Sequence, residues 1–256
     1  MRFAAMIPWL MLALYGARRT ERRKITAAAL SCGLMISMAG QMFLLWRDGL
    51  LNLSTGLPLH ICGMMAALSL PMLWLKPGSL LEMSLYIGMP CALMALCFPA
   101  VIRCSRPLLM EGHFNRLHGL ILCSGVFVFL KGKTLPGDGK RAFLLGSVYL
   151  WLVWAVNPVI GSNYLFLRAV PAGTPLVWLM EKGQMYLIFG YEMLAMVMIR
   201  LLRGVYAKIT FAGSRKAYSR SRRCSLPCTS PHRESEWLPS GRREPGSIPD
   251  RRKDPA

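Results

Sequence analysis

The sequence predicts an all-α membrane protein, a multi-pass bundle of about seven transmembrane helices followed by a disordered basic tail. Three observations predict this class. Hydrophobic residues make up 54% of the 256 positions, more than an ordinary soluble domain carries. Several apolar runs reach the roughly 17–25 residues that a helix needs to cross a bilayer. Basic residues gather between these runs and near the end of the chain.

Seven apolar segments follow one another, and each is expected to form a helix. They lie at residues 3–17, 25–46, 57–75, 80–102, 117–130, 142–160 and 183–202. The first is short for a crossing, so a bundle of six helices with a partial first one stays open. The second, third and sixth carry no acidic or basic residue, and the fourth has only Glu82 near its start. The fifth is short, and snorkelling by Lys131 and Lys133 has to complete its crossing.

The distribution of basic residues predicts the orientation in the cell membrane. Counted over alternate connections and leaving out the tail, Lys and Arg number ten on one side and six on the other. The tail adds many more to the first side. The positive-inside rule therefore places the N-terminus outside and the C-terminus in the cytoplasm. The net charge of +19 is explained by topology and anionic lipid headgroups, so no nucleic-acid partner is predicted.

The bundle is expected to occupy residues 1–205 and the cytoplasmic tail residues 206–256. From about Gly213 the chain is rich in Ser, Pro and Arg. It has too few branched apolar residues to bury a core, so it is expected to be disordered. Within it, Cys224, Cys228 and His232 have a loose metal-like spacing without an evident fourth ligand, so no metal site is predicted.

The third segment opens on the motif LPLHIC at residues 57–62, which places an imidazole and a thiol beside a long apolar run. Pro58 suits the first turn of a helix, so Cys62 is expected within the first two turns. There the positive end of the helix dipole favours the nucleophilic thiolate. His60 is about 200° around that helix from Cys62 and is poorly placed to be its base. His118 is the better candidate, although a cysteine that only packs stays an open alternative.

With the predicted topology, nearly all polar side chains at the ends of the apolar segments lie at the outer face. They are His60, Cys62, His113, His118, Asn157, Asn163, Tyr164, Glu181, Gln184 and Tyr186. Glu192 lies in the middle of the seventh segment, where a carboxyl group must be paired or protonated. It is expected to face the interior of the bundle, either as a hydrogen bond between helices or as part of a polar site.

Three motifs in order carry a family resemblance: LPLH-x-C, HGLIL from His118, and NPVIGSNYLFL at residues 157–167. Over about residues 1–205 the chain resembles the YwaF-like family of integral membrane proteins, which is related to the transmembrane protein 164 acyltransferase family. The resemblance implies transfer of a fatty acyl chain from phosphatidylcholine to a lyso ether phospholipid. It places the nucleophile at Cys62 and its histidine at His118. Gly63 departs from the family pattern, in which a polar residue is common after the cysteine.

The resulting hypothesis is a phospholipid acyltransferase without a cofactor or a metal. Cys62 attacks a donor ester to form a thioester, and His118 takes the thiol proton and later activates the acceptor hydroxyl. Residues expected to bind substrate or the oxyanion are His60, Asn157, Asn163, Tyr164, Tyr186 and Glu192. Membrane phospholipids are the expected partners. A small transporter or receptor, or a structural membrane protein whose polar groups hold helices together, stays the alternative.

Overall fold

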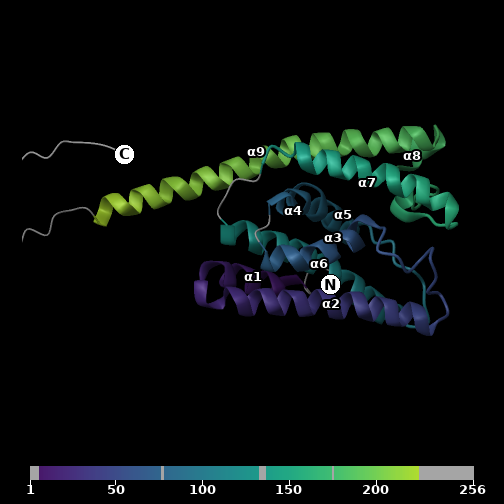
Figure 1. The fold of residues 1–256 in the computed structure, drawn as a ribbon, viewed down its shortest axis with the longest axis horizontal. Coiled ribbons are helices and arrows are strands. Elements are labelled where there is room, and N and C mark those ends of the chain that lie inside the picture. Colours follow the sequence, from purple (N-terminus) through teal and green to yellow (C-terminus); the bar gives the residue numbers. More distant parts are fainter. Residues whose placement is uncertain (1–5, 76–77, 133–136, 175, 225–256) are drawn as a thin grey trace, which may run out of the picture. The chain divides into compact units, whose positions relative to one another are not determined.

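The computed structural model describes residues 6–75, 78–132, 137–174 and 176–224 (Figure 1). All regular secondary structure in these ranges is helical. The helices are α1 (Ile7–Arg18), α2 (Arg23–Arg47), α3 (Ile61–Trp74), α4 (Gly78–Met83), α5 (Met89–Cys97), α6 (Pro107–Gly132), α7 (Lys140–Val159), α8 (Leu176–Glu181) and α9 (Gln184–Cys224). A π-helical turn at Ser84–Gly88 joins α4 to α5, and short 3-10 turns occupy Thr20–Arg22 and Tyr164–Phe166.

The seven apolar segments each contain a helix, which confirms the multi-pass helical bundle. Five helical stretches in the described part of the chain are long and apolar enough to cross a bilayer. They are Thr20–Arg47, Gly78–Cys97, Pro107–Gly132, Lys140–Val159 and Gln184–Thr210. Helix α3 is shorter, with 14 residues, and α1 has 12. The protein is therefore an integral membrane protein, and the sidedness of its termini stays a prediction.

Helix α6 is the central helix of this bundle. It packs against α1, α2, α3 and α5, and its apolar side chains supply much of the core. Leu120, Ile121, Phe127 and Val128 are all fully buried. A helix that is apolar around most of its circumference has to be surrounded by other helices or lipid. The central position of α6 is what brings His118, on the same helix, inside the protein.

Helix α6 also begins earlier than the apolar segment that predicted it. It starts at Pro107, whereas the apolar run was expected from residue 117. Proline is well suited to a first helical turn, and the charged residues Glu111 and Arg116 lower hydropathy without ending a helix. His113 and His118 therefore both lie within the helix rather than at its first residues.

Helix α9 continues beyond the expected boundary of the bundle. The tail was expected from residue 206, but the helix runs to Cys224. Residues 206–224 contain many Ala, Lys and Arg and no proline, a composition that favours a helix. One compact unit ends at Arg215. The rest of the expected disordered tail, residues 225–256, lies outside the described residues, as do Cys228 and His232.

Candidate active site at the start of helix α3

The LPLH segment is not part of the helix that follows it, so the expected place of Pro58 in a first helical turn is wrong. Helix α3 begins at Ile61, and His60 precedes it with an extended backbone (φ −69°, ψ 143°). Pro58 instead folds against the first turn of α3. A Cβ atom on Gly63 would come within 3.1 Å of the Pro58 Cα atom. This close approach is a physical reason for glycine at position 63.

Hydrogen bonds from α7 and from the turn at residues 164–166 hold this extended segment. The Leu57 N–H donates to the Tyr164 hydroxyl at 3.0 Å. The Tyr149 hydroxyl on α7 donates to the Leu59 carbonyl at 3.0 Å. These tertiary bonds replace the backbone bonds that a helix would supply, and they fix the chain immediately before His60 and Cys62.

The hydrogen bonding of His60 determines which of its ring nitrogens carries the proton. The Leu165 N–H donates to His60 Nδ1 at 3.3 Å, so Nδ1 is an acceptor and the neutral ring has its proton on Nε2. The ring lies 5.1 Å from the Tyr164 ring and 5.2 Å from the Phe166 ring, measured between centroids. His60 is thus an oriented N–H donor, the kind of group that stabilises an oxyanion.

His118 has the opposite arrangement. Its Nδ1 lies 2.7 Å from the Phe114 carbonyl oxygen, and because a carbonyl only accepts, Nδ1 carries the proton and Nε2 has a lone pair. The side chain is 4% exposed and packs against the Phe114 ring at 4.1 Å. His118 lies on α6, which packs against α3, and His60 is the residue immediately before α3. One offers a donor and the other a base.

Cys62 lies in the first turn of α3, as the motif predicted. It is partly buried and packs against the apolar core. Apolar surroundings oppose the thiolate and counteract the helix dipole, so Cys62 needs a base to become a nucleophile. In the described part of the chain, no hydrogen bond joins Cys62 to His118. Their joint role stays a prediction, and substrate binding has to bring the two groups into contact.

A strained turn supplies the contact to His60. Leu165 and Phe166 have φ values of 58° and 57°, in the left-handed region that costs non-glycine residues of order 1–3 kcal/mol each. The Leu165 carbonyl accepts a hydrogen bond from the Tyr191 hydroxyl at 3.1 Å. The N–H and the C=O of Leu165 are therefore both fixed, one by His60 and the other by α9. No residue type in this turn predicts a left-handed backbone conformation.

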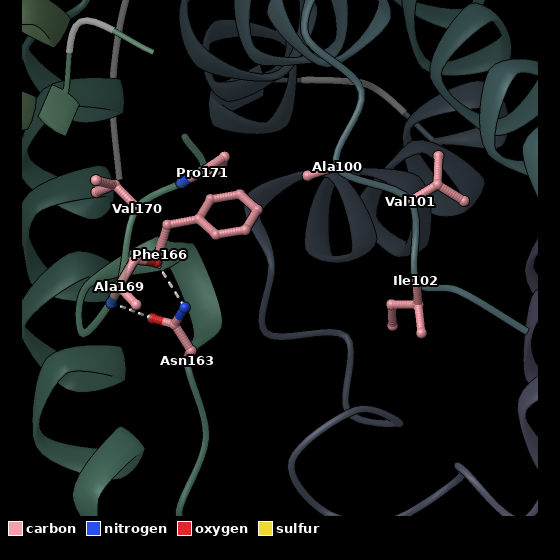
Figure 2. A pocket seen from close by; sticks show the side chains of 8 residues that line it. All are labelled: Ala100, Val101, Ile102, Asn163, Phe166, Ala169, Val170 and Pro171. Carbon is pink, nitrogen blue, oxygen red and sulfur yellow. Dashed lines mark hydrogen bonds between the residues drawn. The ribbon is translucent and has the colours of Figure 1, made fainter. Parts of the chain in front are cut away.

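The polar residues of the NPVIGSNYLFL motif hold the loop that carries this turn. Asn157 is fully buried, donates to the Tyr164 carbonyl and accepts from the Tyr164 N–H, both at 2.9 Å. Asn163 spans Ala169 in the same way, donating to its carbonyl and accepting from its N–H (Figure 2). The Tyr164 hydroxyl donates to the Leu53 carbonyl at 2.9 Å. A role for these three side chains on an oxyanion stays a prediction.

Replacing Asn157 with alanine is expected to lower the free energy of unfolding by about 2–4 kcal/mol. The change leaves the buried N–H of Tyr164 without a partner and leaves its C=O with only the Leu167 N–H at 3.4 Å. The matched control is Asn163→Ala, whose hydrogen bonds are solvent-exposed and whose loss should cost about 1 kcal/mol or less. Denaturant unfolding in detergent, followed by tryptophan fluorescence, measures both. Equal losses in the two variants would contradict this account of the loop.

Two expected site residues lie on α9. Glu192 Oε1 accepts a hydrogen bond from Trp151 Nε1 at 3.1 Å. This bond joins α9 to α7, and a hydrogen bond between helices was one of the two roles expected for Glu192. Tyr186 is 59% exposed, and within the described residues its hydroxyl has no hydrogen-bond partner. Binding of substrate by either residue stays a prediction.

Replacing Glu192 with glutamine distinguishes a hydrogen-bonding role of this residue from a role in proton transfer. The Glu192→Gln variant keeps an acceptor for Trp151, so stability and activity are expected to stay within about twofold of wild type. Glu192→Leu removes the acceptor and is expected to cost about 1 kcal/mol. Thermal unfolding and acyl-transfer rates of both variants provide the measurement. A folded glutamine variant without activity would point to proton transfer by Glu192.

An open apolar cavity of about 320 Å³ lies beside this site. Ala100, Val101 and Ile102, in the connection after α5, line one wall. Phe166 and Pro171 are on the other wall, and Figure 2 shows the Phe166 ring directed into the cavity. The same ring contacts His60. Phe166 therefore contacts both the apolar cavity and the imidazole of His60.

Sequence reasoning missed four contributors to this site: Tyr149, Leu165, Tyr191 and Cys91. The two tyrosines lie within the apolar runs at residues 142–160 and 183–202, where nothing in the sequence indicates a role in this site. Cys91 packs against the same apolar core as Cys62, and the Tyr191 hydroxyl donates a hydrogen bond to the Leu165 carbonyl. Only the three-dimensional packing of α3, α5 and α9 relates them.

Comparison with known proteins gives one match. A family model described as the TMEM164 family matches residues 1–203. This range includes α1 to α8, both loops of the candidate site and the first part of α9, residues 184–203. No curated protein sequence and no solved structure matches the chain.

Proposed function

Because the chain belongs to the TMEM164 family, we propose that it is a cysteine-dependent acyltransferase acting on membrane phospholipids. The observation that carries the proposal is a pair of imidazoles with opposite fixed tautomers, one on α6 and the other on the residue before α3, which packs against α6. His118 offers a lone pair at its Nε2, and His60 offers an N–H at its own Nε2. Acyl transfer needs both, a base for the nucleophile and a donor for the oxyanion.

In the first half of the reaction, Cys62 forms a thioester with the acyl group of a donor lipid. His118 Nε2 takes the thiol proton as the sulfur attacks the ester carbonyl carbon, and His60 Nε2–H donates to the oxyanion. The bond from carbon to the lipid oxygen then breaks. The leaving oxygen takes the proton back from His118, so a lysophospholipid departs and the acyl chain stays on Cys62.

The second half returns the enzyme to its starting state. His118 Nε2 accepts the proton of an acceptor hydroxyl, and that oxygen attacks the thioester carbonyl. The bond from carbon to sulfur breaks, and the sulfur takes the proton from His118. The acyl chain has moved to the acceptor lipid with no net change in protons.

A lipid substrate fits the surroundings of this site better than a soluble one. Cys62 stands at one end of an apolar helix, the depth at which an ester group of a phospholipid lies. The cavity beside Phe166 is lined almost entirely by apolar side chains, which suits a hydrocarbon chain. The family resemblance suggests phosphatidylcholine as donor and a lyso ether phospholipid as acceptor.

The test is transfer of a labelled acyl chain by purified protein in vesicles. Phosphatidylcholine with an isotope-labelled acyl chain is mixed with an unlabelled lyso ether phospholipid. The lipids are then separated and quantified by mass spectrometry. The label is expected in the acceptor, with an equal amount of lysophosphatidylcholine. Label found only in free fatty acid would indicate hydrolysis, and label that stays in the donor would contradict the proposed function.

A further inference from the structure

Helices α3 and α5 form the two arms of a hairpin. Helix α3 contacts α4, the turn at Ser84–Gly88 and α5, and it ends at Trp74, close in sequence to the start of α4 at Gly78. So short a connection between contacting helices makes the two arms antiparallel. Residues one helical turn before a contact on one arm therefore face residues one turn after it on the other.

The closest approach in this hairpin is between Met65 and Gly88. A Cβ atom on Gly88 would lie 3.0 Å from Met65 Cε and 3.4 Å from Met65 Cβ, so the absence of a side chain at position 88 lets the backbones come together. One turn back along α3 is Cys62, and one turn forward along α5 is Cys91. The register of the hairpin places the two thiols opposite each other.

Their surroundings agree with this register. Both cysteines are free and partly buried, and both pack against the same apolar core. A disulfide needs Cα atoms about 4.4–6.8 Å apart. Helices in close contact at a glycine can provide such a spacing.

We propose that Cys62 and Cys91 are a site of reversible oxidation, in which the two thiols form a disulfide. The oxidant is a small disulfide such as oxidised glutathione. One cysteine sulfur attacks it and releases one glutathione, and the second cysteine displaces the other glutathione. Two electrons and two protons leave the protein. The loss of acyl transfer that follows rests on the proposed function, whereas formation of the disulfide does not.

Peptide mapping under oxidising conditions tests the inference on the full chain. Purified protein is treated with oxidised glutathione, the remaining thiols are blocked with N-ethylmaleimide, and the protein is digested and analysed without reduction. A peptide linking Cys62 to Cys91 is expected as the main cross-link, and dithiothreitol should remove it. Alkylation of both thiols, or their capture in other pairs or as glutathione adducts alone, would overturn the inference.

Two variants make the mapping specific. Cys97, also on α5, is exposed, so Cys97→Ala should give the same cross-link as wild type. Cys91→Ala should leave Cys62 without a protein disulfide. If the link forms but no acyl transfer occurs in any state, the proposed function fails and this inference stands. If the protein transfers acyl chains but never forms the link, this inference fails and the proposed function stands.

Discussion

Replacing Cys62 with serine is expected to lower the rate of acyl transfer by a factor on the order of 10³ or more. Serine has nearly the same shape, so lipid binding and packing of α3 should persist. Its hydroxyl is much less acidic than a thiol, and a base adapted to a thiol activates it poorly. The rate of transfer from labelled phosphatidylcholine to the lysophospholipid, compared in the same vesicles, measures the loss.

The matched control for this prediction is Cys97→Ser. Cys97 is an exposed thiol at the end of α5, so its replacement should leave the rate within about twofold. Thermal unfolding of both variants shows whether the bundle is intact. A folded Cys62→Ser protein with the wild-type rate would remove this residue from the chemistry and favour the transporter or structural alternative.

Replacing His118 with glutamine is expected to lower kcat by a factor of about 10²–10⁴ with little change in KM. Glutamine fills similar space on α6 but cannot accept and return a proton. Substrate binding should persist because His118 is buried and acts on the thiol rather than on the headgroup. Initial rates over a range of acceptor concentrations in mixed micelles separate the two constants.

His113→Gln is the control for a histidine of the same helix. The His113 ring packs against Gly40 on α2, away from any role in the proposed reaction, and its loss should change kcat by less than about threefold. Equal losses in kcat for both histidines would indicate a general effect on α6. A rise in KM alone for His118→Gln would assign that residue to binding instead of proton transfer.

The sequence predicts the fold well because a bilayer imposes a simple requirement on each crossing. Runs without charge, such as residues 25–46 and 142–160, had to become helices. The helix ends were less predictable. Leu57 and Leu59 are as apolar as the residues that follow them, yet they lie outside α3 because Tyr149 and Tyr164 bind their backbone. Hydropathy has no access to such tertiary hydrogen bonds.

The site is predictable only in outline. The LPLHIC and NPVIGSNYLFL motifs were expected at the same face of the bundle, and in the structure His60 contacts Tyr164 and Leu165. The separate roles of the residues in NPVIGSNYLFL could not be predicted. An asparagine that holds a loop and one that binds an oxyanion look alike in a sequence. The left-handed backbone of Leu165 has no residue signal at all.

The thioester is the intermediate that the whole account requires, and intact mass measures it directly. Purified protein is incubated with phosphatidylcholine in the absence of an acceptor, and the intact masses of wild type and of Cys62→Ser are compared. The account predicts an added mass of one acyl chain on wild type alone, which neutral hydroxylamine removes. Acyl transfer without any such adduct, or the same adduct on both proteins, would contradict a reaction through Cys62.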